Sequence, residues 1–346
     1  MPGRGSGGSS PALLRRLHCV CAHVVRTADA TEPFNNDGAV GGSALSDFDS
    51  PVDLATEQVA QYKRSGFLVL PGFINSASVQ CLVHTLDTIT KGSTLGEHDR
   101  QVLEMEPEQP DTGRLVRRIY EPCGRYQPFR NFAESPMLLS AVSQLLGSRD
   151  LVYHYSKVNM KPPHVDTIVD WHQDLSYYPL TNRSSVAVLL YLDDADERNG
   201  ALRVVARDQS LLNGMLNHNS PDGFFQGRIP SLGTPDGADS PSDQIVLEAP
   251  AGSCIFLGGL TPHASAANHS EHYRRTLIIS YRTADNFPLY LSGERYTTEK
   301  NVRLVSGKES LSARMEAGIP SIPVPRYRHS AESIFEIQGR SRRGEA

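Results

Sequence analysis

The chain has 346 residues, of which 39% are hydrophobic and 21% charged, and its formal net charge is -5. These proportions are ordinary for a globular protein and supply enough apolar side chains for a sizeable core. The mild negative charge predicts neither a nucleic-acid partner nor binding to anionic lipid. No apolar run approaches the roughly 18 residues that a membrane span requires, so we predict no membrane span.

Residues 1–50 differ in composition from the rest of the chain. They are rich in Gly, Ser and Ala, and several arginines precede the first acidic residue, Asp29. Such a start is typical of an organellar targeting peptide. The run at 16–24 also resembles the N-terminal peroxisomal address, except for its final Val24. We therefore expect a flexible segment at 1–50 and a peroxisomal location, with mitochondrial and cytoplasmic locations or an untargeted tail as alternatives.

Helices are expected first and short strands later. Periodic apolar residues predict helices at 54–65, 76–90 and 137–146. Short apolar runs bounded by Gly, Pro, Asn and Asp predict strands at 67–70, 115–120, 151–160, 185–192, 202–206, 245–247, 253–257 and 275–281. Many short strands with such turn residues predict a sandwich, jelly roll or barrel.

Two stretches lack a strong periodic pattern. Residues 91–113 are polar and are expected to form a loop. Residues 208–243 contain repeated turn signals, and so long a stretch inside a domain suggests a functional lid. We expect one domain over 51–307 and a C-terminal tail over 308–346. Five cysteines without a CxxC pair favour a reducing compartment over a disulfide framework.

The strongest chemical signal is Trp171-His172-Gln173-Asp174. In an extended chain alternate side chains share a side, so His172 and Asp174 can offer a nitrogen and an oxygen to one divalent ion. A bare HxD is common by chance, and a third ligand must come from elsewhere. His263, which follows the predicted strand at 253–257, is the best candidate. Two histidines and one carboxylate form the facial triad of non-haem Fe(II) oxygenases, which leaves coordination positions open.

An arginine downstream of the third ligand adds to this pattern. Arg274 stands eleven residues after His263. Its planar guanidinium can bind the distal carboxylate of a 2-oxoacid through two hydrogen bonds. Arg275 is the alternative, because side-chain parity along the strand decides which arginine faces inward.

These motifs occur in an order that resembles the phytanoyl-CoA dioxygenase family. The resemblance runs from about Tyr62 to Arg282 and includes the segments 62–73, 161–163, 171–179, 192–202 and 263–275. It implies a mainly β fold, a double-stranded β-helix with flanking N-terminal helices. It also implies a dioxygenase that requires Fe(II), 2-oxoglutarate and O₂, with ascorbate in support.

The resemblance assigns roles to individual residues. It implies that the iron ligands are His172, Asp174 and His263, and that 2-oxoglutarate is held by Arg274 and Ser265. Lys157 and Arg118 fall at positions where relatives contact the co-substrate. The chain departs from the family at Leu189, where relatives often carry Trp. Beside the metal, Trp171, Tyr177 and Tyr178 are either substrate contacts or packing residues.

The implied reaction is hydroxylation of an unactivated C–H bond. Relatives that halogenate have a small residue where this chain has Asp174. The substrate is expected to be a branched or long-chain acyl-CoA hydroxylated beside its thioester, or else a free small metabolite. Two other readings are a cupin-like metal-binding protein without oxygenase activity and an inactive relative. Arg274 and Ser265 favour the oxygenase, because a simple metal site needs no anchor for a 2-oxoacid.

Overall fold

The structure is a computed structural model that describes residues 48–205, 215–218, 227–237, 239–289, 301–316, 338–339 and 342–343. The run at 16–24 that resembles a targeting signal lies outside these ranges, as do parts of the predicted lid. No helix among the described ranges is both long enough and apolar enough to cross a membrane.

Antiparallel strands in two sheets make up most of the fold. The major sheet has eight strands in the order β1-β9-β6-β11-β4-β3-β2, with β12 paired to β4, and the minor sheet has four in the order β5-β10-β7-β8. The strands of the major sheet are β1 (Phe67–Leu70), β2 (Leu103–Met105), β3 (Val116–Tyr120), β4 (Leu151–Lys161), β6 (Ser185–Tyr191), β9 (Cys254–Gly258), β11 (Arg274–Thr283) and β12 (Arg303–Ser306). Those of the minor sheet are β5 (Val169–His172), β7 (Leu202–Val205), β8 (Gln244–Val246) and β10 (His263–Ser265).

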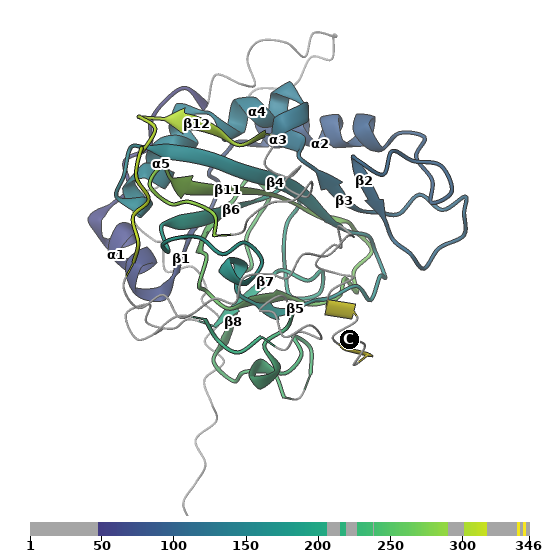
Figure 1. Ribbon diagram of the computed structural model, residues 1–346. Coiled ribbons are helices and arrows are strands. Elements are labelled where there is room, and N and C mark those ends of the chain that lie inside the picture. The colour runs from purple at the N-terminus through teal and green to yellow at the C-terminus, as the bar shows by residue number, and fades with distance from the viewer. Residues whose placement is uncertain are drawn as a thin grey trace, which may run out of the picture. The chain divides into compact units, whose positions relative to one another are not determined.

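In the part of the chain that the structure describes, five α-helices precede β4 in the sequence. They are α1 (Thr56–Ser65), α2 (Ser76–Thr90), α3 (Pro122–Arg125), α4 (Gln127–Ala133) and α5 (Pro136–Leu146). Figure 1 shows α3, α4 and α5 on the outer side of the major sheet, with β5, β7 and β8 on its other side. Two short 3-10 helices, η2 (Asp174–Ser176) and η3 (Pro230–Leu232), lie in connections of the minor sheet.

Local sequence explains where the helices begin and end. The Asn75 side chain accepts a hydrogen bond from the backbone N–H of Ser78 at the start of α2, and Ser135 does the same for α5. Such caps satisfy an N–H group that has no partner within the helix. Helix α1 ends at Gly66, whose φ of 81° is a left-handed conformation that glycine adopts without a steric penalty.

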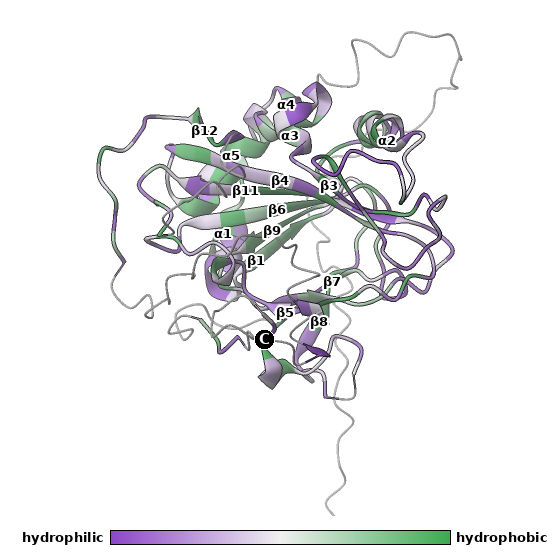
Figure 2. Ribbon diagram, turned by 45° about the vertical axis from the view of Figure 1, so that its right-hand side comes forward, coloured by the Kyte–Doolittle hydropathy of each residue, from purple (hydrophilic) through white to green (hydrophobic). Residues whose placement is uncertain are grey.

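The major sheet is buried on both faces, and alternate residues of each strand belong to different cores. On β11, Leu277 and Ile279 pack with the helices, whereas Ile278 faces the minor sheet. On β6, Val188 faces the helices and Leu189 faces the minor sheet. A strand covered on both sides has few solvent-facing positions, so the middle of each of these two strands is apolar. The green colour of β9 in Figure 2 shows the same feature.

The mainly β prediction, with two sheets and N-terminal helices, is confirmed. The structure matches the predicted helix at 76–90 and strand at 67–70, and it shifts most other boundaries by one or two residues. The expected loop at 91–113 contains the short strand β2, and the sequence analysis missed α3, α4, β5, β10 and β12. These elements are three to seven residues long, too short for apolar periodicity to show.

Replacing Ile279 by Ala is expected to lower the free energy of unfolding by about 2–5 kcal/mol, because it leaves a cavity between β11 and the helices. Ile279 is 0% exposed. Denaturant titration measures the change. The control is Leu311→Ala at a fully exposed position, which should change stability by less than about 0.5 kcal/mol. Equal effects of the two substitutions would contradict this description of the core.

Candidate metal centre and its pocket

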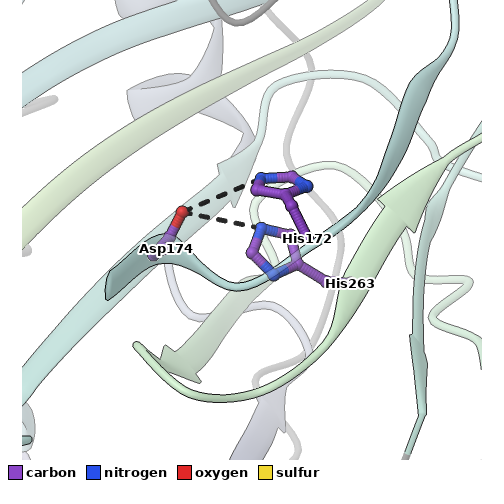
Figure 3. A group of neighbouring side chains, drawn as sticks. All are labelled: His172, Asp174 and His263. Atoms are coloured by element: carbon purple, nitrogen blue, oxygen red, sulfur yellow. Dashed lines mark ion pairs between the residues drawn. The ribbon is translucent and has the colours of Figure 1, made fainter. Parts of the chain in front are cut away.

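Pairing between β5 and β10 brings the three predicted metal ligands together. His172 is the last residue of β5, His263 is the first of β10, and the two are directly paired across the strands. Asp174 begins η2, two residues beyond the end of β5. Its Oδ1 lies 3.9 Å from Nε2 of His172 and 3.7 Å from Nε2 of His263 (Figure 3). These separations exceed hydrogen-bond length, so the three groups face a common point without bonding to one another.

The prediction assumed an extended chain across His172 and Asp174. The strand ends at His172, and Asp174 belongs to a 3-10 helix. Gln173 between them is still extended, with φ -118° and ψ 134°. An extended middle residue keeps its two neighbours on the same side. His172 and Asp174 therefore share a side, although the strand does not continue beyond His172.

Each histidine of this group is held in one tautomer by the backbone. Nδ1 of His172 donates to the carbonyl oxygen of Asp170 at 2.8 Å, and Nδ1 of His263 donates to that of Thr261 at 2.9 Å. Nδ1 therefore carries the proton, and Nε2 keeps its lone pair for a metal. Burial and the neighbouring His263 also lower the pKa of His172, which favours the neutral form that binds a metal.

The donor set fits Fe(II). Ligand atoms from these three buried side chains all lie within 4.8 Å of one another, close enough for one ion to bind all three. Two neutral imidazoles and a carboxylate are the ligands of the 2-His-1-carboxylate facial triad.

Gln173 joins the two segments that carry the ligands. Its side chain donates to the carbonyl oxygen of Leu260 at 2.6 Å and accepts from the backbone N–H of Leu216 at 2.7 Å. Its own N–H donates to Nε2 of His218 at 3.1 Å, while Nδ1 of His218 donates to the carbonyl oxygen of Leu216. Residues 215–218, part of the predicted lid, are thus bound directly behind the ligands.

A residue of the predicted C-terminal tail also contacts this region. The Gln338 side chain accepts from the Asp170 N–H at 2.9 Å and lies 3.4 Å from the Asp170 carbonyl oxygen, the group to which His172 donates. Arg342 donates to the Asp170 carboxylate at 2.6 Å. The sequence analysis missed Gln173, His218 and Gln338. Of these three residues, only Gln173 could have been recognised from the sequence, because it stands inside the HxD motif.

The metal group and residues of both sheets line a pocket with an empty volume of about 700 Å³, which includes its opening to solvent. At its far end the Arg274 guanidinium donates to the side chains of Thr276 and Ser265 and to the Gly200 carbonyl oxygen, at 2.7 to 2.9 Å. All these partners are uncharged, and Nε of Arg274 is buried without a partner in the described structure. Gly200 is required here because a Cβ would lie 2.4 Å from the Ala266 carbonyl oxygen.

A second buried cation, which the sequence analysis missed, lies opposite Arg274. Lys161 is its directly paired neighbour on β4, and both residues line the pocket. Lys161 donates to the carbonyl oxygens of Thr167 and Ala266. Burial and the neighbouring Arg274 hold the pKa of Lys161 well below its usual value. Like charges at directly paired positions repel, so this end of the pocket is suited to an anion.

The orientation of the two arginines is now clear. Arg275 points away from the pocket and makes two side-chain hydrogen bonds to Asp193, at 2.9 and 2.7 Å. It is therefore already paired with a carboxylate. Arg118 is buried, lies 3.6 Å from Glu104 and donates to Asn159 at 3.2 Å, and it is not among the described residues that line the pocket.

The aromatic residues beside the metal group have different surroundings. Trp171 is fully buried and packs with Val205, Ile229, Leu232 and Ala264, outside the described pocket lining. The packing reading is thus the right one for Trp171. The Tyr177 ring lies edge-on to His172, and its hydroxyl donates to Gly227. Tyr178 shares a hydrogen bond of 2.8 Å with the hydroxyl of Tyr155, which lines the pocket.

Comparison with known proteins agrees with this site. The family model described as phytanoyl-CoA dioxygenase (PhyH) matches residues 62–276. A relative from Stutzerimonas stutzeri, named a probable alpha-ketoglutarate-dependent hypophosphite dioxygenase, is 28% identical over 283 residues, 82% of this chain and 96% of the relative. An ectoine dioxygenase from Bordetella bronchiseptica is 25% identical over 248 residues, 67% of this chain and 77% of the relative.

Solved structures confirm the fold. A non-haem monooxygenase, ThoJ in its apo form, superposes with a TM-score of 0.56 at 20% identity, over 76% of this chain and 89% of ThoJ. At such identity the likeness concerns the jelly-roll fold alone.

Replacing any one of His172, Asp174 and His263 by Ala is expected to abolish iron binding at micromolar Fe(II), because two ligands leave the ion too weakly held. Iron content after anaerobic loading and desalting measures this. His84→Ala, at an exposed position on α2, is the matched control and should load normally. Full loading of the three ligand variants would contradict the metal centre.

Replacing Gln173 by Leu keeps the volume but removes both side-chain hydrogen bonds that join the ligand segments. Iron affinity is expected to fall about 10- to 100-fold, as it does when groups that orient metal ligands are lost. Competition with a chromogenic chelator measures the affinity. Gln127→Leu on the exposed side of α4 should leave it unchanged. If both variants bind iron equally well, Gln173 does not position the ligands.

Proposed function

The chain belongs to the phytanoyl-CoA dioxygenase family of Fe(II)- and 2-oxoglutarate-dependent dioxygenases, and we propose that it hydroxylates a small free metabolite. We assign the iron to His172, Asp174 and His263, and the distal carboxylate of 2-oxoglutarate to Arg274 and Ser265. The observation that carries this proposal is the metal group at one end of a pocket and, at the other end, a buried arginine without an anionic partner.

The iron and the co-substrate supply the oxidation when bound: O₂ is consumed, 2-oxoglutarate becomes succinate and CO₂, and one oxygen atom enters the substrate. The residues of the chain position the iron and the co-substrate. Arg274 and Ser265 hold one end of 2-oxoglutarate, and the backbone carbonyls of Asp170 and Thr261 keep both imidazoles ready to bind iron. The walls between are the apolar side chains of Leu189, Leu257 and Ile278, which exclude water from the reacting centre.

Arg274, rather than Arg275, is proposed as the anchor because Asp193 already neutralises Arg275. A carboxylate between Arg274 and Lys161 would relieve the repulsion between these two cations. This anchor also favours an oxygenase over a cupin-like protein that only binds a metal. A protein that only binds a metal does not need a buried anion site in the same pocket as the ion.

A free small metabolite is preferred over an acyl-CoA as the substrate. The relatives named above act on hypophosphite and on ectoine, both small free molecules. Leu189 makes the co-substrate wall aliphatic where the family often has Trp. A screen of succinate release with small metabolites and acyl-CoAs, in the presence of Fe(II), 2-oxoglutarate and ascorbate, separates the two classes. Release only with acyl-CoAs would reject the preference.

Replacing Arg274 by Ala is expected to raise the apparent KM for 2-oxoglutarate at least about tenfold, since hydrogen bonds to a charged group contribute about 1.5–3 kcal/mol. Iron loading should not change, because Arg274 does not contact the ligands. Arg275→Ala is the control and should leave this KM nearly unchanged. The weak visible band of Fe(II) with 2-oxoglutarate, recorded without air, gives the binding constant directly. A larger effect from Arg275→Ala would reverse the assignment.

A further inference from the structure

The C-terminal half of β4 carries polar groups on the side that faces the pocket. Four alternate residues, Tyr155, Lys157, Asn159 and Lys161, line the pocket. Lys161 lies opposite Arg274, at the end proposed for the co-substrate, whereas Lys157 is paired with Ile278. Lys157 and Arg274 therefore stand four residues apart along the sheet, which corresponds to about 13 Å.

One molecule of 2-oxoglutarate does not span this distance. Its two carboxyl carbons are joined by four bonds of about 1.5 Å, so they lie at most about 6 Å apart. Strand side chains stand roughly perpendicular to their sheet, which keeps the Lys157 and Arg274 charges about as far apart as their backbones. When Arg274 holds the co-substrate, Lys157 is left for another ligand.

The groups around Lys157 have unused hydrogen-bonding capacity. Lys157 forms no hydrogen bond or ion pair with the described residues, and its ammonium lies 5.7 Å from the centre of the Tyr155 ring. Asn159 accepts from Arg118 through its Oδ1, which leaves the Nδ2 group as a donor. The Tyr155 and Tyr178 hydroxyls bond to each other, and the Tyr178 hydroxyl also donates to the Asp174 carboxylate, so the free donors here are those of Lys157 and Asn159.

The charges around the pocket favour an anion at this position. Lys157 is partly buried, and no carboxylate among the described residues is hydrogen-bonded to it. Behind Asn159, the carboxylate of Glu104 is shared by Arg117 at 2.5 Å and Arg118 at 3.6 Å. An anionic substrate group would pair with the Lys157 ammonium, whereas a neutral or cationic group would leave that charge without a counter-charge.

We infer that Lys157 and Asn159, beside the Tyr155 ring, form a subsite for an anionic group of the hydroxylated substrate, such as a carboxylate or phosphonate. This inference rests on the proposed function. It moves Lys157 from the co-substrate, to which the family resemblance assigned it, to the substrate. The C–H bond that reacts then belongs to a small molecule held by its anionic end on the Asp174 side of the iron.

The test uses defined probes that differ in charge. Full-length protein with Fe(II) and 2-oxoglutarate is titrated without air with butanoate, propylphosphonate, butanamide, dimethyl propylphosphonate and butanoyl-CoA. The change in the visible band gives each dissociation constant, and succinate release in air is measured in parallel. We expect butanoate or propylphosphonate to bind at least about tenfold more tightly than its neutral counterpart, because one charge-assisted contact is lost in the latter.

Variants at Lys157 separate the substrate from the co-substrate. Lys157→Met should weaken binding of the anionic probe about 10- to 100-fold, while 2-oxoglutarate titrated alone should bind within about twofold of the original protein. Lys157→Arg keeps the charge and should restore most of the probe affinity. Lys63→Met, at an exposed position on α1, controls for the loss of a lysine.

Several results would overturn the inference. These are equal binding of neutral and anionic probes, no response to any small anion, binding of butanoyl-CoA alone, or a loss of 2-oxoglutarate affinity in Lys157→Met. The original protein distinguishes this failure from a failure of the proposed function. If Fe(II) and 2-oxoglutarate give no visible band, the proposed function itself fails. If the band forms and no small anion shifts it, only the anionic subsite is rejected.

Discussion

The cross-strand pair between His172 and His263 is the interaction on which the rest of the site depends. It joins two residues that are 91 positions apart in the sequence, and it places their rings 4.1 Å apart between centroids. Strand pairing can do this because a directly opposed pair has a fixed separation and a common side. Backbone acceptors two residues before each histidine then set the tautomer. The metal group is therefore formed by the sheet rather than by a flexible loop.

The second constraint is the burial of positive charge beside an apolar sheet. Arg274 and Lys161 lie side by side, and nothing acidic in the described structure is hydrogen-bonded to either. Hydroxyl and carbonyl oxygens accept hydrogen bonds from Arg274, and carbonyl oxygens accept them from Lys161. These groups are neutral, so they stabilise the two positive charges without cancelling them. A structure that needed only stability would not retain this arrangement, since apolar residues at the same positions would fit the surrounding core. The unfavourable charge density is better explained by binding of an anion.

The sequence predicted the metal group better than it predicted the surrounding contacts, and the reason is physical. His172, Asp174 and His263 could be recognised because few residue types bind iron, and their order and spacing resembled a known family. Apolar strands such as β6 and β9 could be recognised because few structures other than a buried strand fit a short apolar run bounded by turn residues. Lys161 could not, because its importance depends on register with β11, and register is a property of the folded pair. The choice between Arg274 and Arg275 depended on that register too.

The segments that pack behind the metal ligands have polar, irregular sequences, and their composition does not reveal that they contact the metal centre. Residues 215–218 and Gln338 come from stretches that look irregular, yet each bonds to the backbone beside a ligand. Gln173 N–H and Asp170 N–H are buried, and a buried backbone donor without a partner is costly. β5 is a four-residue strand that ends at the metal, so its own ladder does not pair these groups. Side chains from distant segments supply the missing acceptors, and the metal centre is thereby tied to parts of the chain whose sequence shows no regular pattern.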